Sequence, residues 1–201
     1  MNYLEKNYEK VKTIFFHELG HFIAYKNSTK AIEGFKIIDL QIQPCTECQN
    51  GFKGFIVPLP PPGYKNNARM SPERLAHNFS NNYFGCLFQL LLTDSDQHLA
   101  LCMQDYGQRD QEKLNTTLQS YGLLGKTSEI ENHFYKFHKE LKKKNFESLK
   151  NLNFDELFIE IDKGVQVRLD SLNTQTTNFV KDFTTIYDKQ LMELIDIIKT
   201  N

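Results

Sequence analysis

Two histidines and a glutamate near the N-terminus have the types and spacing needed for metal chemistry. The chain reads His17-Glu18-Leu19-Gly20-His21. Residues four apart on a helix lie one above the other, so His17 and His21 can present ring nitrogens to one point. Two such ligands suit tetrahedral zinc, and Glu18 is placed to act as a general base without binding the metal. The pattern therefore predicts a zinc ion beside a carboxylate that accepts a proton from water.

The alternative is a helix that happens to carry two histidines, one of them buried and hydrogen-bonded. The flanking segments Ile14-Phe15-Phe16 and Phe22-Ile23-Ala24 are apolar. They favour the metal site, because a helix that binds a metal is usually buried. Gly20 costs about 1 kcal/mol of helix stability relative to alanine, so another backbone or a substrate is expected to pack close to it.

A third ligand has to come from another element, and the fourth position stays open for water in a catalytic site. The residues alone leave several candidates open: Asp94, Asp96, His98, Asp105, Asp110 and Glu112. Asp110 stands where a helix is expected to begin, so a plain capping or first-turn role is its alternative.

The overall charge is close to balanced, with 24 Lys+Arg against 25 Asp+Glu in 201 residues. That balance argues against nucleic acid as a main partner, since phosphate binding needs a basic surplus. No apolar run approaches the length needed to cross a bilayer, and the N-terminus lacks the pattern of a secretory signal. The sequence therefore predicts a cytoplasmic protein without a membrane span.

The periodicity of apolar residues predicts a mainly α fold with a small β-sheet or hairpin, in the α+β class. Strands are expected at 34–42 and 52–59, around a turn that ends in Asn50-Gly51. Helices are expected at 3–27, from Ser71-Pro72 to 92, and at 97–104, 110–121, 127–150, 154–172 and 175–199. We expect residues 1–125 to form the core with the zinc motif, and residues 126–201 to form a C-terminal helical subdomain of the same domain.

Four cysteines are present. Cys45 and Cys48 form a C-x-x-C pair that could be a disulfide or half of a metal site. A pair of reduced thiols at a hairpin tip is favoured, given the reducing compartment expected. Cys86 and Cys102 lie in apolar helical contexts and are expected to be buried thiols.

The chain resembles the peptidase domain of the FtsH-type ATP-dependent zinc metalloproteases. Four segments carry the resemblance in order: Phe16–His21, the strand pair 35–43 and 54–59, Tyr83-Phe84-Gly85, and Gly107–Asp110. It implies a zincin-like helical metallopeptidase domain that hydrolyses peptide bonds. It also implies zinc bound by His17, His21 and Asp110 with Glu18 as general base, and leaves Asp94 or Asp96 as the fallback ligand.

The chain also departs from the family pattern. It has Phe88-Gln89-Leu90 where the family usually has acidic residues, and its spacing from Gly107 to Asp110 is one residue shorter. The ATPase module and the transmembrane segment of the family are not found in this sequence, so the resemblance does not extend to ATP-driven, processive proteolysis. The resemblance implies a polypeptide substrate, a hexameric homo-oligomer and a separate ATPase partner.

Two other functions fit the same motif. A regulatory peptidase of the ImmA/IrrE type, which cuts one partner such as a repressor, also carries a His-Glu-x-Gly-His helix. The early position of the motif and the hairpin after it favour the FtsH-like interpretation. A non-catalytic zinc-containing module for protein interaction is the third possibility.

Overall fold

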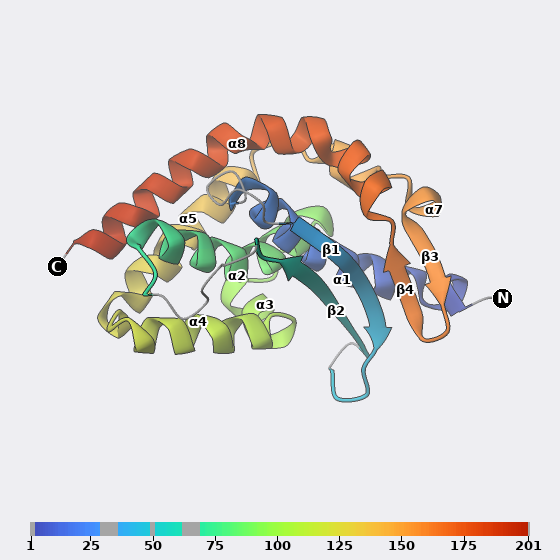
Figure 1. The fold of residues 1–201 in the computed structure, drawn as a ribbon, viewed down its shortest axis with the longest axis horizontal. Coiled ribbons are helices and arrows are strands. Elements are labelled where there is room, and N and C mark those ends of the chain that lie inside the picture. Colours follow the sequence, from blue (N-terminus) through green and yellow to red (C-terminus); the bar gives the residue numbers. More distant parts are fainter. Residues whose placement is uncertain (1–2, 29–35, 49–50, 62–68, 201) are drawn as a thin grey trace.

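The protein is mostly helical, with one small antiparallel sheet (Figure 1). This computed structural model describes residues 3–28, 36–48, 51–61 and 69–200. The α+β class predicted from the sequence is confirmed.

Two helices form the centre of the fold. Helix α1 spans Tyr3–Ser28, and helix α2 spans Pro72–Leu92. The expected start of α2 is confirmed, because the Ser71 side chain accepts a hydrogen bond from the Arg74 amide and Pro72 occupies the first turn. The two helices pack closely along their apolar faces, and most of α2 is buried.

Gly20 marks a close approach of α1 and α2. A Cβ atom placed on Gly20 would lie less than 3.0 Å from the carbonyl group of Phe84. The expectation that another backbone packs against this glycine is therefore confirmed. Since only hydrogen fits there, Gly20 allows the two helix backbones to touch.

The sheet joins a hairpin from the N-terminal half of the chain to a hairpin from the C-terminal half. Strands β1 (Lys36–Pro44) and β2 (Phe52–Leu59) form the expected hairpin, apart from residues 34, 35, 49 and 50, which lie outside the described residues. Strands β3 (Phe158–Ile161) and β4 (Gly164–Val167) complete the antiparallel order β2-β1-β4-β3. The contact between the two hairpins is short, with Gln41 opposite Gln166 and Ile42 opposite Val165.

The prediction of a single helix at 154–172 is wrong. This segment forms a four-residue helix α7 (Phe154–Leu157), then β3 and β4. Gly164 has a φ of +138°, which favours glycine, and follows the two-residue turn between the strands. Val165 and Val167 are buried against the core, and pairing with β1 supplies hydrogen bonds that local periodicity does not reveal.

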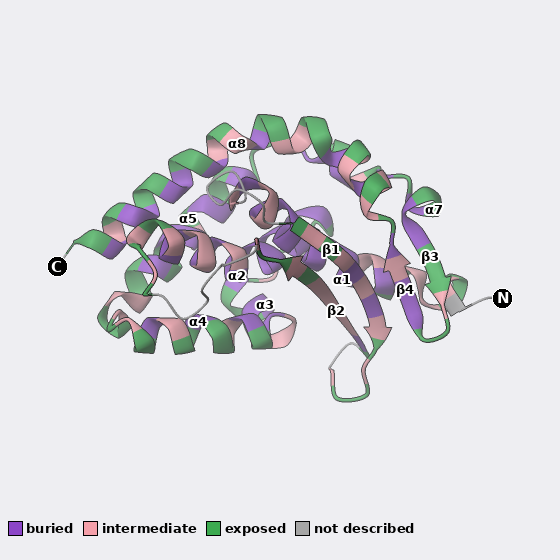
Figure 2. Ribbon diagram, in the orientation of Figure 1, coloured by how far each residue is buried: buried purple, intermediate pink, exposed green. Residues whose placement is uncertain are grey.

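The last helix is longer than expected and begins earlier. Helix α8 spans Leu169–Lys199 and arches over α5 and α2 (Figure 1). The division into residues 1–125 and 126–201 stays a prediction, although the second part contributes strands to the sheet of the first. The outward side of α8 is largely exposed, whereas the central helices are largely buried (Figure 2).

Shorter helices connect these parts. Helix α3 spans Leu99–Asp105 and α4 spans Gln108–Ser120, close to the two helices expected there. After the 3-10 turn η1 (Leu124–Lys126), helix α5 spans Thr127–Leu141 and a short α6 spans Glu147–Lys150. The single helix expected at 127–150 is thus interrupted after Leu141. Among the described residues, no helix is long and apolar enough to cross a membrane.

Aromatic side chains fill the space between α2 and the C-terminal helices. Phe84 of α2 contacts Phe137 of α5 and both Phe183 and Tyr187 of α8 through ring centroids 5.5–6.1 Å apart. Rings at these separations bury large apolar areas and add favourable edge contacts. Helix α2 is therefore held from both sides, by α1 and by α8.

The cysteines fall into two classes. Cys45 and Cys48 are joined by a disulfide at the hairpin tip. The favoured prediction of two reduced thiols is therefore wrong. The turn explains the pairing, because the Cys45 amide donates to the Gly51 carbonyl and the turn folds back on itself. Cys86 and Cys102 are free and buried, as expected.

Gly20→Ala tests the close packing of α1 and α2. The added methyl group meets backbone, which cannot rotate away, so we expect unfolding to become easier by about 3 kcal/mol despite the better helix propensity of alanine. Urea denaturation followed by circular dichroism measures the change. Gly125→Ala is the matched control, since no described atom lies within 4 Å of a Cβ there. Equal stability of the two variants would contradict this account of the helix contact.

Candidate metal centre

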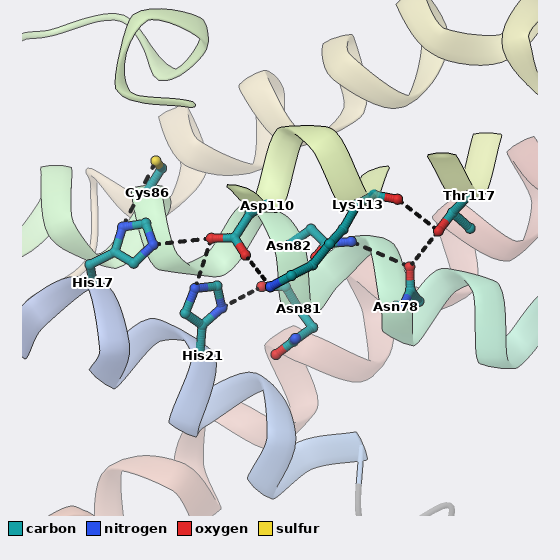
Figure 3. A network of polar contacts seen from close by, with 9 residues as sticks. All are labelled: His17, His21, Asn78, Asn81, Asn82, Cys86, Asp110, Lys113 and Thr117. Atoms are coloured by element: carbon teal, nitrogen blue, oxygen red, sulfur yellow. Dashed lines mark hydrogen bonds and ion pairs between the residues drawn. The ribbon is translucent and has the colours of Figure 1, made fainter. Parts of the chain in front are cut away.

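Three side chains that are distant in the sequence meet beneath a cleft. The Oδ2 atom of Asp110 lies 3.2 Å from Nε2 of His17 and 3.0 Å from Nε2 of His21 (Figure 3). One donor atom from each residue lies within 4.8 Å of the others, and all three residues are buried. Nitrogen and carboxylate donors this close together could hold a metal ion.

The helices explain why these side chains converge. His17 and His21 are one turn apart on α1, so their rings lie on one face with centroids 4.8 Å apart. Asp110 lies in the first turn of α4, where the helix dipole favours a negative charge. Its second oxygen, Oδ1, accepts a hydrogen bond from Nζ of Lys113, which lies 3.0 Å away and one turn further along α4. One carboxylate oxygen therefore faces the histidines, and the other faces a lysine.

The outer ring nitrogens of both histidines are held by α2. Nδ1 of His17 lies 3.1 Å from Oε1 of Gln89, and Nδ1 of His21 lies 2.8 Å from the backbone oxygen of Asn81. The oxygens accept, so each Nδ1 donates its proton, and each Nε2 faces Oδ2 of Asp110. The sulfur of Cys86 lies 4.0 Å from the same His17 nitrogen. Partners of this kind fix the orientation of metal-binding imidazoles.

A glycine in α2 leaves the space that the rings occupy. A Cβ atom on Gly85 would lie 2.5 Å from Nε2 of His17 and 2.7 Å from Nε2 of His21. Any larger residue at this position would displace the Nε2 atoms of both histidines. The glycine-bearing helix of the resemblance, Tyr83-Phe84-Gly85, thus lies directly behind the site.

Glu18 faces the cleft next to the histidines. The cleft has a volume of about 560 Å³, and its lining includes α1, the hairpin and the α3–α4 segment. A Cβ atom on Gly54 of β2 would overlap the Glu18 side chain, so this glycine makes room for it. Burial raises the pKa of Glu18, and the nearby histidines oppose that rise without cancelling it. A carboxylate with a raised pKa is a better proton acceptor.

The charges of His21 and Asp110 are strongly linked. Burial disfavours the imidazolium, but the charge and hydrogen bond of Asp110 outweigh burial and raise the pKa of His21 to about 9. Burial alone would raise the pKa of Asp110, whereas the two histidines lower it. Without a metal ion, a proton therefore fills the space between these groups, and a cation can replace it.

The other candidate ligands lie elsewhere. Asp94 pairs with Lys150, and Asp96 lies 3.5 Å from Lys142, both near the C-terminal end of α2. His98 accepts a hydrogen bond from the Ala100 amide at the start of α3. Of the remaining candidates, only Asp110 joins the histidines, and two others line the cleft without doing so: Asp105 and Glu112.

Sequence reasoning missed the supporting residues. Gln89 was noted only as a departure from the family pattern, although a polar residue within an apolar helix stretch signals a buried hydrogen bond. Asn81 contributes its backbone carbonyl to His21, and no side-chain pattern could reveal that. Tyr25, which also lines the cleft, stands four residues after His21, a spacing visible in the sequence.

Comparison with known proteins adds no relative: no family model, no curated protein and no solved structure matches this chain. The function is therefore argued from the site itself.

Metal affinity should depend on pH through His21. A metal ion needs neutral imidazole, and the proton on His21 competes with it below a pKa of about 9. We expect the affinity of the metal-free protein for a divalent metal ion to rise about tenfold per pH unit from pH 7 to 8.5 and then level off. Competition with a chromophoric chelator measures the affinity. A constant affinity over this range would contradict the proton–metal exchange.

Proposed function

We propose that this protein is a zinc-dependent peptidase that hydrolyses peptide bonds in flexible polypeptides. One observation carries the proposal: the buried group of His17, His21 and Asp110 lies beside Glu18 at a cleft open to solvent. Metal donors without a general base would suit a structural ion, and a glutamate without the donors would lack an activating partner. Their combination at a cleft suits hydrolysis.

The donor set favours zinc among the metals. Two imidazole nitrogens and one carboxylate oxygen are ligands typical of catalytic zinc, which keeps a fourth position open. Calcium and magnesium prefer oxygen ligands alone. When bound, zinc polarises the peptide carbonyl and lowers the pKa of a water molecule to about 7.

The residues of the chain supply the proton transfers. Glu18 takes a proton from the attacking water as the water oxygen bonds to the peptide carbonyl carbon. The carbon–nitrogen bond then breaks, and the same proton passes from Glu18 to the leaving nitrogen. One water is consumed, and a carboxylic acid and an amine are formed. The raised pKa of Glu18 suits a group that accepts and then returns a proton.

The hairpin offers a way to hold the substrate. Strand β2 lies at one edge of the sheet that the described residues form, and residues 52–56 of this strand line the cleft. An extended polypeptide could pair with this edge through backbone hydrogen bonds, which recognise no particular side chains. A requirement for extended backbone would restrict cleavage to unfolded or flexible segments.

Two features favour a catalytic metal over a purely structural one. Within the part of the chain that the structure describes, the protein donors number three, whereas structural zinc sites are almost always closed by four. Glu18 is buried beside the donors but is not one of them. The order of the motif, hairpin, α2 and Asp110 also supports the FtsH-type resemblance, and with it the proposal of a homo-oligomer served by a separate ATPase.

The metal itself is tested by elemental mass spectrometry. Protein purified without chelators should contain about one zinc ion per chain. His17→Ala and Asp110→Ala should lose it, and Gln89→Leu should weaken zinc affinity about 10- to 100-fold because His17 loses its orienting partner. His98→Ala, which removes a histidine outside the site, is the control. Wild-type protein without zinc would remove the basis of the peptidase proposal.

Glu18→Gln tests the general base. Glutamine keeps the size of the side chain but accepts no proton, so we expect cleavage of fluorescently labelled casein to fall at least about 100-fold with unchanged zinc content. Glu129→Gln, on the exposed first turn of α5, is the matched control. Cleavage that persists in Glu18→Gln would exclude Glu18 as the base. Cleavage of casein by the wild type would also favour a general peptidase over one that cuts a single partner.

A further inference from the structure

Tyr25 lies one helical turn beyond His21 on α1. The residues 17, 21 and 25 are spaced by four, so Tyr25 continues the face that carries both histidines. Long side chains on a helix lean toward its N-terminus, which directs the Tyr25 ring toward His21. Tyr25 lines the same cleft as Glu18 and is only partly buried. Its hydroxyl can therefore meet a ligand in the cleft.

Asn81 links Tyr25 to the histidines. Its backbone oxygen accepts the hydrogen bond from His21, and its side chain forms a hydrogen bond with the Tyr25 hydroxyl. Among the described residues, the side-chain oxygen of Asn81 has no hydrogen-bond partner, so the amide N–H is the donor in this bond. The hydroxyl oxygen of Tyr25 accepts this bond. One residue of α2 thus fixes the position of both His21 and the phenol.

Lys113 on α4, three residues after the proposed ligand Asp110, is already engaged in an ion pair. Lys113 donates to Oδ1 of Asp110 at 3.0 Å, and moving it would leave that buried carboxylate oxygen without its ion pair. A neutral donor avoids this conflict. A phenol can donate a hydrogen bond without placing another positive charge beside the proposed metal ion.

We propose that the Tyr25 hydroxyl donates a hydrogen bond to the carbonyl oxygen of the peptide bond being cleaved, and that Asn81 positions the hydroxyl for this role. The inference rests on the proposed peptidase function. The carbonyl oxygen gains negative charge as water adds to the carbon, so this hydrogen bond is stronger in the transition state than in the bound substrate. Burial raises the pKa of Tyr25 more than its neighbours lower it, which keeps the phenol protonated at neutral pH.

Tyr25→Phe removes the hydroxyl and keeps the ring. With zinc-loaded protein and labelled casein, we expect kcat to fall about 100-fold, while KM and zinc content stay close to wild type. Binding of a phosphinate peptide, which imitates the tetrahedral transition state, should weaken by a similar factor. The matched control is Tyr135→Phe, which removes a hydroxyl from a tyrosine on α5 that stacks on His98, outside the residues that line the cleft.

Asn81→Ala tests the positioning role separately. Alanine keeps the backbone oxygen that holds His21, so zinc content should not change. We expect a smaller fall in kcat than in Tyr25→Phe, and no further fall when the two substitutions are combined, because Asn81 acts through the phenol.

The possible failures are distinguishable. If the wild type cleaves casein and Tyr25→Phe retains kcat within about threefold, this inference is wrong and the peptidase function stands. Loss of zinc in Tyr25→Phe would assign Tyr25 a structural role and would also overturn the inference. If zinc-loaded wild type cleaves nothing, the proposed function falls and the inference falls with it.

Discussion

The shared carboxylate oxygen of Asp110 is the interaction on which the site depends. A single oxygen from the first turn of α4 lies within hydrogen-bond distance of the facing nitrogens of His17 and His21. Three buried polar groups cannot remain there without a proton or a cation between them, because unpaired buried charge is costly. The raised pKa of His21 and the lowered pKa of Asp110 express this constraint, and the proposed metal ion satisfies it by replacing the proton.

Helix α2 supplies almost everything that supports this group. Its Gly85 leaves room for the Nε2 atoms of the two histidines, and its Gln89 and the Asn81 carbonyl hold their Nδ1 atoms. Phe84 provides the backbone against which Gly20 packs. These contacts require α1 and α2 to touch over the turn that carries the site. The aromatic packing of α5 and α8 on the other side of α2 holds the helix in place, so distant C-terminal residues contribute to the geometry of the centre.

The sheet completes the cleft rather than the donor set. Gly54 of β2 makes space for Glu18, and the edge position of β2 leaves backbone groups beside the same cleft. The C-terminal hairpin pairs with β1 and leaves β2 at the edge, where an extended polypeptide could be aligned. The proposed base, the proposed oxyanion donor Tyr25 and the proposed substrate strand thus surround one space, each from a different element or turn.

The sequence by itself determined the features that depend on local spacing. The four-residue spacing of His17 and His21, the hairpin of β1 and β2 and the start of α2 at Ser71-Pro72 follow from helix, turn and cap geometry, which act over a few residues. Asp110 was one of several candidates by its chemistry and was preferred only through a resemblance. The tertiary structure alone decided that Asp110 rather than Asp94 meets the histidines and that 158–167 form strands, because these depend on contacts between residues far apart in the chain. The tertiary structure alone also decided that the Asn81 carbonyl accepts a hydrogen bond from His21, because a backbone acceptor cannot be recognised from the sequence.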